Sequence, residues 1–261
     1  MNGRLKGQTA VITGAGRGLG RAIAVAFAGE GAATWICART RSELDTTADH
    51  IRALGGWVEA HEVDLSDPDA CIGFAFRVLE QSRHVDVLVN NAAVLRFVPI
   101  EDVSLSEWAD ALAINLTAPF LLTRAVLPAM RERGGSLINV SSRAGVLGFA
   151  RETPYCASKF GLEGFTRAVA LELAGARVSV NTVTPGLRIK PTSLADADVP
   201  DRSAEERDAW NDPGLLAPAF LYLAQLRGEV SGLRFDAHRL TLALARQGAQ
   251  LTPERVKELA E

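Results

Sequence analysis

Tyr155 and Lys159 are the two residues whose types and spacing most directly suggest chemistry. They stand four positions apart in a segment predicted to be helical, so they share one face of that helix. A phenol has a pKa near 10 and is a poor acid–base group at neutral pH, but an adjacent ammonium favours the phenolate. We therefore expect Lys159 to lower the pKa of Tyr155 by about two or three units, each worth about 1.36 kcal/mol, and Tyr155 to transfer a proton.

Further polar residues stand where they could assist that transfer. Ser141 and Ser142 end a predicted strand shortly before Tyr155, and a hydroxyl there could hold a substrate carbonyl oxygen while Tyr155 delivers the proton. Asn115 lies among apolar neighbours in the predicted helix Trp108–Met130, and a buried amide needs hydrogen-bond partners. A local structural hydrogen bond would explain any one of these residues, but their grouping at one sheet edge favours a catalytic site.

A glycine-rich turn, TGAGRGLG from Thr13 to Gly20, follows the first predicted strand and precedes the helical run Arg21–Ala28. Without Cβ atoms the backbone can approach a pyrophosphate, whose charge is stabilised by free amides and by the positive end of the helix dipole. The spacing Gly-x-x-x-Gly-x-Gly differs from the six-residue dinucleotide fingerprint. A tight turn with close helix packing is the alternative interpretation.

The end of the second predicted strand indicates which dinucleotide binds. An acidic residue there hydrogen-bonds a ribose 2′-hydroxyl, whereas an arginine accommodates a 2′-phosphate. The strand ends in Arg39, no carboxylate occurs before Glu43, and Arg17 in the glycine turn offers a second cation. Each guanidinium could supply a charge-assisted hydrogen bond of about 1.5 to 3 kcal/mol. NADP(H) is therefore favoured over NAD(H), the alternative being that both arginines are solvated surface residues.

Two other strand ends carry candidate cofactor contacts. Asp64 follows the third strand and could accept a hydrogen bond from an adenine amine, or could simply cap a turn. The segment NNAA, residues 90–93, closes the fourth strand, where small side chains would permit close contact with a cofactor. A plain turn is the competing account of that segment.

Short apolar runs alternate with helix-length segments along most of the chain, which predicts βαβ units and one parallel sheet with helices on both faces. We expect all 261 residues to form a single domain. The segment Leu187–Asp212 is predicted to be a loop or lid, and the tail Leu240–Glu261 to be helical. The predicted strands are Thr9–Thr13, Thr34–Ala38, Trp57–Val63, Val85–Val89, Ser136–Val140, Val178–Val183 and Leu233–Phe235.

Composition narrows the classes of partner. The formal net charge is -3 and the basic residues are scattered, which argues against nucleic acid and anionic membranes and favours a small-molecule substrate. Cys37, Cys71 and Cys156 have neither metal-ligand nor disulfide spacing, so we expect buried free thiols and no metal. No apolar signal region precedes the first strand, which makes the cytoplasm the expected compartment.

Taken together, these motifs resemble the short-chain dehydrogenase/reductase family, and the match spans nearly the whole chain, from Gly7 to Asp236. The resemblance implies a Rossmann-like, doubly wound sheet of seven parallel strands and a homotetramer or homodimer. The positions that carry it are Thr13-Gly14-x-x-x-Gly18-x-Gly20, Asp64, Asn90-Asn91-Ala92, Asn115, Ser142, Tyr155-x-x-x-Lys159 and Pro185-Gly186.

The resemblance also implies roles. Tyr155 would be the general acid in carbonyl reduction, Ser142 would orient the carbonyl, Lys159 would bind the nicotinamide ribose, and Asn115 would hold a water of the proton relay. Ser142 is preferred to Ser141 because it lies thirteen residues before Tyr155, as in the family pattern. The implied cofactor contacts are Gly14, Arg17, Gly18, Leu19, Gly20, Arg39, Asp64, Leu65, Asn91, Ala92, Tyr155, Lys159, Pro185 and Gly186.

The expected activity is therefore NADP(H)-dependent interconversion of a ketone and a secondary alcohol. The alternatives are an NAD-linked alcohol dehydrogenase and a non-catalytic, cofactor-binding regulatory protein of the same fold. Lys190 stands where the family usually has a threonine, and Ala237-His238 replace its glycine pair. The substrate is not predicted. Arg143 and Arg151 would indicate an anionic substrate if they faced the pocket, although solvent exposure is the favoured interpretation. Other expected pocket-border residues are Phe97, Leu147, Phe149 and Leu187.

Overall fold

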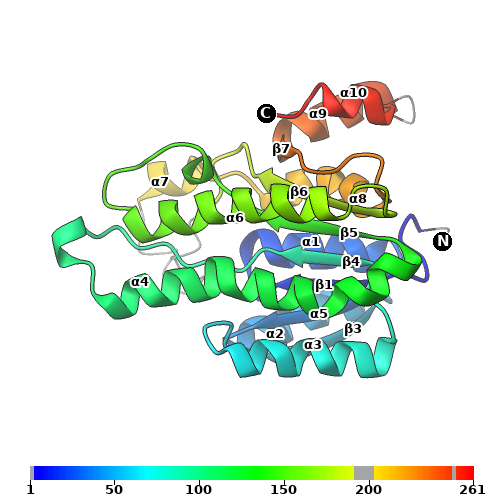
Figure 1. The fold of residues 1–261 in the computed structure, drawn as a ribbon, viewed down its shortest axis with the longest axis horizontal. Coiled ribbons are helices and arrows are strands. Elements are labelled where there is room, and N and C mark those ends of the chain that lie inside the picture. Colours follow the sequence, from blue (N-terminus) through cyan, green and yellow to red (C-terminus); the bar gives the residue numbers. More distant parts are fainter. Residues whose placement is uncertain (1–2, 191–202, 249–250) are drawn as a thin grey trace.

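The computed structural model of the protein describes residues 3–190, 203–248 and 251–261. Seven parallel strands form one sheet in the order β3-β2-β1-β4-β5-β6-β7 (Figure 1). The predicted α/β class is confirmed, and each predicted strand is present with its ends shifted by two residues or fewer. The strands are β1 (Thr9–Thr13), β2 (Ala33–Ala38), β3 (Trp57–Glu62), β4 (Val87–Asn90), β5 (Gly135–Val140), β6 (Val178–Thr184) and β7 (Arg234–Asp236).

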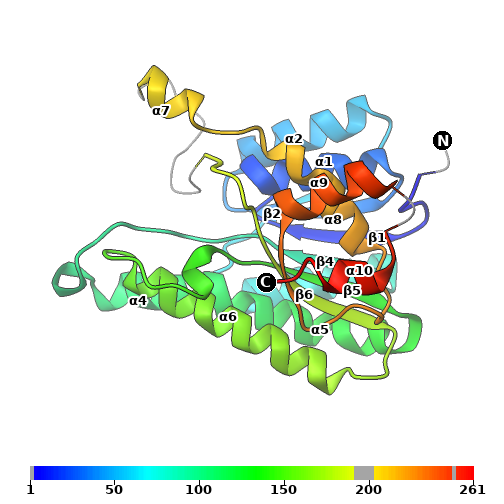
Figure 2. The same ribbon diagram turned by 90° about the horizontal axis from the view of Figure 1, so that it is seen from above.

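Helices cover both faces of the sheet, as Figure 2 shows from above. One hydrophobic core lies under α1, α2, α8 and α9, and a second lies under α3, α5 and α6. This double cover explains why β1, β4, β5 and β6 are buried at every position. These helices are α1 (Gly18–Gly29), α2 (Arg41–Ala53), α3 (Pro68–Ser82), α5 (Ala118–Arg133), α6 (Thr153–Glu172), α8 (Ala217–Ala224) and α9 (Ala237–Gln247).

The strand order reverses between β1 and β4, which are neighbours in the sheet although β2 and β3 separate them in sequence. In such sheets the chain leaves adjacent strands toward opposite faces, so a crevice opens beyond their carboxyl ends. The glycine turn after β1 and the Asn-Asn-Ala segment after β4 both lie at that point.

Capping signals that can be read from the sequence, Asp67-Pro68, Ser104 with Glu107, and Asp212-Pro213, mark the starts of three helical elements. The Asp67 side chain accepts from the Asp69 backbone N–H at 2.9 Å, with Pro68 as the first residue of α3. Ser104 and Glu107 form a reciprocal capping box at the start of α4 (Leu105–Leu112). The Asp212 side chain, like that of Asp67, accepts from a backbone N–H two residues on, but the element it begins is a short 3-10 helix rather than an α-helix.

The predicted helix Trp108–Met130 is longer than expected and is interrupted. It comprises α4, a π-helical turn at Ala113–Thr117, and α5. By length and composition Leu105–Arg133 could cross a membrane, but 44% of its most apolar window is buried inside the protein. Its apolar face packs on the sheet and on α3, so it serves as a core helix.

The two segments outside the regular alternation are described only in part. The predicted lid Leu187–Asp212 includes residues 191–202, which lie outside the described residues, and a short helix α7 (Ala204–Asp208). The predicted helical tail consists of the end of α9 and of α10 (Pro253–Lys257), which Thr252 caps. Val256 and Leu251 are buried, so the described part of the tail is docked on the core.

Candidate active site

The glycine turn fits a dinucleotide at three levels. Gly14 and Gly18 have φ of 64° and 54°, in the left-handed region that favours glycine. A Cβ on Gly20 would lie 2.2 Å from the Gly14 carbonyl oxygen, so α1 can pack this closely only through glycine. Finally, α1 begins with no side-chain cap and no acidic residue in its first turn. Its first amides are therefore available to an anion such as a pyrophosphate.

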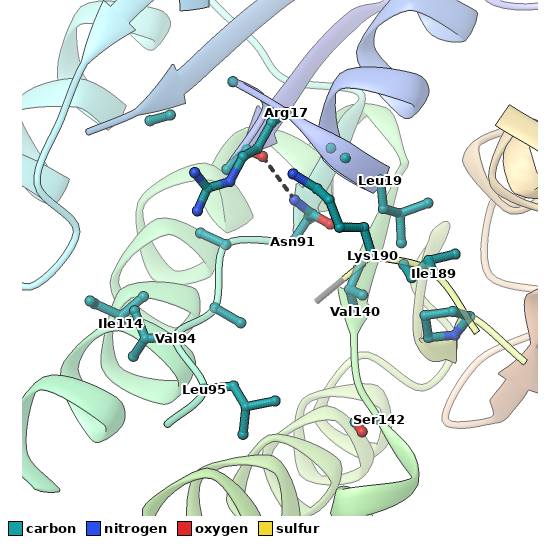
Figure 3. Close-up of a pocket in the computed structure, with 18 of the residues that line it drawn as sticks. Arg17, Leu19, Asn91, Val94, Leu95, Ile114, Val140, Ser142, Ile189 and Lys190 are labelled. Carbon is teal, nitrogen blue, oxygen red and sulfur yellow. Dashed lines mark hydrogen bonds between the residues drawn. The ribbon is translucent and has the colours of Figure 1, made fainter. Parts of the chain in front are cut away.

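A cavity of about 530 Å³ runs from this turn to the end of β5. Figure 3 shows Arg17 and Leu19 on one side of it, Val94, Leu95 and Ile114 on another, and Ser142 at the far end. Predicted site residues that line it are Gly14, Arg17, Gly18, Leu19, Gly20, Arg39, Leu65, Asn91, Ala92, Ser142, Tyr155, Lys159 and Pro185. The structure thus brings most of the predicted set into one space.

The segment after β4 is fastened to the glycine turn. The Thr13 hydroxyl accepts from the backbone N–H groups of Asn91 and Ala92, both at 3.0 Å. The Asn91 amide in turn donates to the Thr13 carbonyl at 2.9 Å and the Gly14 carbonyl at 3.2 Å. These bonds hold the two sides of the crevice at a fixed separation.

The two predicted phosphate-binding arginines are not equivalent. Arg17 pairs with Glu43 at 2.8 Å, and both side chains are partly buried. Arg39 is exposed at the cavity rim and, among the described residues, has no carboxylate within ion-pair distance. Arg39 is therefore the guanidinium better placed to meet an added phosphate, since Arg17 would first have to share its charge with Glu43.

Two predicted cofactor contacts, Asp64 and Gly186, are absent from the cavity lining. The Asp64 carboxylate accepts from the Ser66 backbone N–H at 2.9 Å and the Ser66 hydroxyl at 2.7 Å. These bonds lower the pKa of Asp64 and make it a turn cap, which is the alternative that the sequence allowed. Gly186, with φ of 72°, lies against the Asp236 carboxylate, where a Cβ would not fit.

Tyr155, Ser142 and Lys159 meet at the far end of the cavity. Tyr155 and Lys159 come from α6, and Ser142 follows β5 directly. The Ser142 hydroxyl accepts from the Ala144 backbone N–H at 3.2 Å, which orients it. The three polar groups thus reach one space from two separate elements.

The expected lowering of the pKa of Tyr155 is wrong. Burial of the phenol raises the pKa of Tyr155 to about 12, and a hydrogen bond with Ser142 offsets only part of that rise. Tyr155 lines the cavity and keeps some accessible surface, but its phenol is surrounded mainly by protein atoms and is therefore largely desolvated. The prediction relied on the charge of Lys159, but desolvation of the phenol has the largest effect on the pKa of Tyr155.

Lys159 is itself strongly perturbed. The residue is 2% exposed, and burial lowers its pKa to about 8, while the Glu163 carboxylate acts in the opposite direction. Its ammonium donates to the Val140 carbonyl at 2.7 Å and lies 5.6 Å from the centre of the Tyr155 ring. The lysine is thus anchored to the end of β5 rather than to the phenol oxygen.

Asn115 is buried in the π-helical turn and bridges two elements. Its side-chain oxygen accepts from the Val94 N–H at 2.8 Å, and its amide donates to the Val94 carbonyl and the Ser158 hydroxyl, both at 3.0 Å. Both amide protons are therefore used. Because Ser158 also donates to the Tyr155 carbonyl at 2.7 Å, Asn115 ties the β4 loop to the helix that carries Tyr155.

The substrate end of the cavity is apolar and basic. Phe97 and Leu187 line it as expected, and so do Arg143 and Arg188. The guanidinium carbon of Arg143 lies 5.7 Å from the centre of the Phe149 ring. Neither Arg143 nor Arg188 has an ion-pair partner in the described part of the chain. Leu147, Phe149 and Arg151, by contrast, are not in the lining, and Arg151 instead donates to the Phe97 carbonyl at 3.3 Å.

Sequence reasoning missed two residues behind the site, Glu163 and Arg234. Both are buried and their side chains form an ion pair. A usable signal existed, because Glu163 continues the four-residue spacing of Tyr155 and Lys159 along α6. Arg234 could have been found as a charge in a predicted buried strand, which requires a partner.

Two of the three cysteine expectations are met. Cys37 and Cys71 are buried free thiols, and burial raises the pKa of each thiol, to about 11 for Cys71. Cys156 is only partly buried, because it follows Tyr155 near the start of α6. The described residues contain no cluster of metal-ligating side chains.

Comparison with known proteins finds relatives over most of the chain. Residues 8–201 match the family described as short chain dehydrogenase. A 3-oxoacyl-[acyl-carrier-protein] reductase of Thermotoga maritima is 32% identical over 239 residues, covering 88% of this chain and 97% of that protein. A D-threitol dehydrogenase of Mycolicibacterium smegmatis is 38% identical over 190 residues, 70% of each.

Solved structures give the same picture. A metagenomic short-chain oxidoreductase in complex with NADP is 37% identical, with a TM-score of 0.75 over 87% of this chain and 96% of that one. A carveol dehydrogenase of Mycobacterium avium in complex with NAD is 28% identical, with a TM-score of 0.78 over 90% and 98%. The seven-stranded sheet is shared with both NADP- and NAD-bound proteins.

Proposed function

This chain belongs to the short-chain dehydrogenase family, and we propose that it uses NADP(H) to interconvert a ketone and a secondary alcohol. Its relatives are dehydrogenases and reductases, so the chain is an oxidoreductase acting on CH–OH or C=O groups of small molecules. The finer proposal concerns the coenzyme, the direction and the residues that carry the reaction.

The observation that carries the proposal is the meeting of Ser142, Tyr155 and Lys159 at the end of a cavity that begins at an uncapped helix N-terminus. When bound, a nicotinamide dinucleotide supplies or accepts the hydride. What the protein must add is a proton donor and an anchor for the carbonyl oxygen at the same place.

Tyr155 serves as that donor. With a pKa of about 12 its phenol is fully protonated at neutral pH, which suits an acid that gives a proton to the oxygen of a carbonyl under reduction. The Ser142 hydroxyl, held by the Ala144 N–H, donates a second hydrogen bond to the same oxygen. Together they favour the alkoxide-like oxygen that develops as the carbonyl is reduced.

Lys159 has two roles in the proposed reaction. Its ammonium lies close to the Tyr155 ring and stabilises negative charge on the phenol in the reverse, oxidative direction. Because it is anchored to the Val140 carbonyl, it also presents N–H donors at the cavity wall, where the hydroxyls of a nicotinamide ribose would bind.

NADP(H) is the proposed coenzyme because Arg39, just after β2, forms no ion pair with a carboxylate in the described part of the chain. Gly14, Gly18, Leu19, Gly20, Asn91 and Ala92 would hold the rest of the dinucleotide. Asp64, Leu65, Pro185 and Gly186 remain proposed contacts of that ligand. We further propose one domain, a cytoplasmic location and a homodimer or homotetramer.

The test is a spectrophotometric screen of ketones with NADPH and NADH, and of secondary alcohols with the oxidised coenzymes. The proposal expects NADPH oxidation with at least one ketone class and a smaller kcat/KM with NADH. A higher kcat/KM with NADH would favour the NAD-linked alternative. Tight coenzyme binding without turnover on any ketone or alcohol would favour a regulatory protein.

A further inference from the structure

Arg234 is a buried charge that faces the back of the proposed site. It begins β7, the last strand of the sheet, and its side chain is 3% exposed. The guanidinium donates to the Ser142 carbonyl at 3.1 Å and, in a longer contact, to the Ser141 hydroxyl at 3.4 Å. Two of its bonds are therefore directed at the dipeptide that carries the proposed carbonyl anchor.

The remaining N–H groups are directed at two carboxylates. One is Glu163 on α6, whose side chain is 5% exposed and which also accepts from the Thr182 hydroxyl at 2.8 Å. The other is Glu261, which accepts from Arg234 Nε at 2.8 Å and whose backbone N–H donates to the Arg234 carbonyl at 2.9 Å. The planar fork of an arginine can make such divergent bonds, whereas the ammonium of a lysine cannot.

We propose that Arg234 is a positioning residue: with Glu163 and Glu261 it fixes the backbone of Ser142 relative to the helix that carries Tyr155. The inference rests on the proposed function, because Ser142 and Tyr155 must reach the same substrate oxygen. They come from different elements, β5 and α6. Lys159 and Thr166 bond β5 itself, and the Arg234–Glu163 pair adds a buried connection from α6 to the Ser142 backbone. An error of about 1 Å in such a geometry can cost about 100-fold in rate.

The inference assigns a role to the tail, which the sequence did not reveal. Leu251 and Val256 are buried, and they dock the segment that ends in the Glu261 contact. The Glu261 side chain is 37% exposed, so it is the most accessible of the three residues Arg234, Glu163 and Glu261. The tail is thus linked to Ser142 through a single arginine.

The experiment is a double-mutant cycle on kcat for ketone reduction, with Arg234→Met and Ser142→Ala as the two changes. If Arg234 acts through Ser142, Arg234→Met lowers kcat about 10- to 100-fold in the native background and less than about 2-fold in the Ser142→Ala background. NADPH affinity, measured by fluorescence titration, stays within about 2-fold in both. Equal fold losses in the two backgrounds overturn the inference.

Two further variants keep the test valid if Arg234→Met does not fold. Arg234→Lys retains the charge opposite Glu163 but loses the fork, so kcat stays low even where Tm recovers; native kcat in that variant overturns the inference. Glu261→Gln is expected to lower kcat, whereas Glu258→Gln, the same change at an exposed position on the tail, is not. Equal kcat in Glu261→Gln and Glu258→Gln also overturns it.

These outcomes are separable from failure of the proposed function. If Ser142→Ala alone retained native kcat, the role of Ser142 would be lost. If Ser142→Ala is impaired and Arg234→Met adds its full loss to it, the proposed function stands and only the role of Arg234 is lost.

Discussion

Replacing Arg39 by serine should switch off the discrimination between NADPH and NADH. Arg39 is exposed just after β2 and forms no ion pair among the described residues, although its charge helps to lower the pKa of Asp64; its guanidinium N–H groups can therefore donate to a 2′-phosphate. A hydrogen bond to a charged group contributes about 1.5 to 3 kcal/mol. At 1.36 kcal/mol per tenfold change, the Kd for NADPH should rise about 10- to 150-fold.

The assay is titration of NADPH and NADH by fluorescence or calorimetry at fixed ionic strength. The Kd for NADH should change less than about 3-fold, because NADH lacks the phosphate. Arg52→Ser, at the far end of α2, removes the same charge from a residue paired with Asp49 and serves as the control. Arg17→Ser should have a smaller effect than Arg39→Ser, because Glu43 already holds Arg17.

Two results would exclude this role of Arg39. If Arg39→Ser weakened the binding of NADPH and NADH equally, Arg39 would stabilise the loop after β2 rather than bind a phosphate. If NADPH affinity were unchanged, the phosphate would have to bind elsewhere, and the preference for NADP(H) would lose its structural basis.

Three more outcomes are expected. The value of kcat/KM for NADPH depends on ionisations of the free enzyme and should fall as the pH rises through about 8. The reason is that Lys159 is charged below that pH and neutral above it, while Tyr155 stays protonated to about pH 12. A pH profile that is flat to pH 10 would contradict the lowered pKa of Lys159. Arg143→Gln should raise KM for oxo acids about 10-fold, which corresponds to the loss of one charge-assisted hydrogen bond, and leave KM for neutral ketones unchanged. The reason is that Arg143 lines the substrate end of the cavity without an ion-pair partner in the described chain. Equal changes in KM for both substrate classes would rule out a contact between Arg143 and a substrate carboxylate. Asn115→Leu should lower the free energy of unfolding by about 1 to 3 kcal/mol, because the Val94 N–H and carbonyl lose their partner; chemical denaturation measures this, and an unchanged midpoint would contradict it.

Sequence pattern predicted the fold because the physics that decides it is local. A strand covered on both faces is apolar throughout, as β1 and β5 are, and the caps at Asp67 and Ser104 place helix starts to within a residue. The family resemblance implied a doubly wound sheet of seven parallel strands, but the order of the strands was not predicted.

The electrostatics of the site could not be predicted in the same way. Desolvation depends on how many groups surround a side chain, and that is a property of the packed fold; hence the pKa of Tyr155 rises although Lys159 is four residues away. The pairing of Arg17 with Glu43, which leaves Arg39 as the available cation, is a tertiary contact across 26 residues. Arg234 and Glu163 lie 71 residues apart and meet only because β7 packs beside β6.

In the proposed reaction the Tyr155 hydroxyl supplies the proton while the rest of the cavity binds the coenzyme. The direct measurement is kcat for ketone reduction by Tyr155→Phe, with the Kd for NADPH determined on the same preparation. We expect kcat to fall by about 10²- to 10⁴-fold while the Kd for NADPH changes less than about 3-fold. A variant that reduced ketones at more than a tenth of the native rate would contradict it.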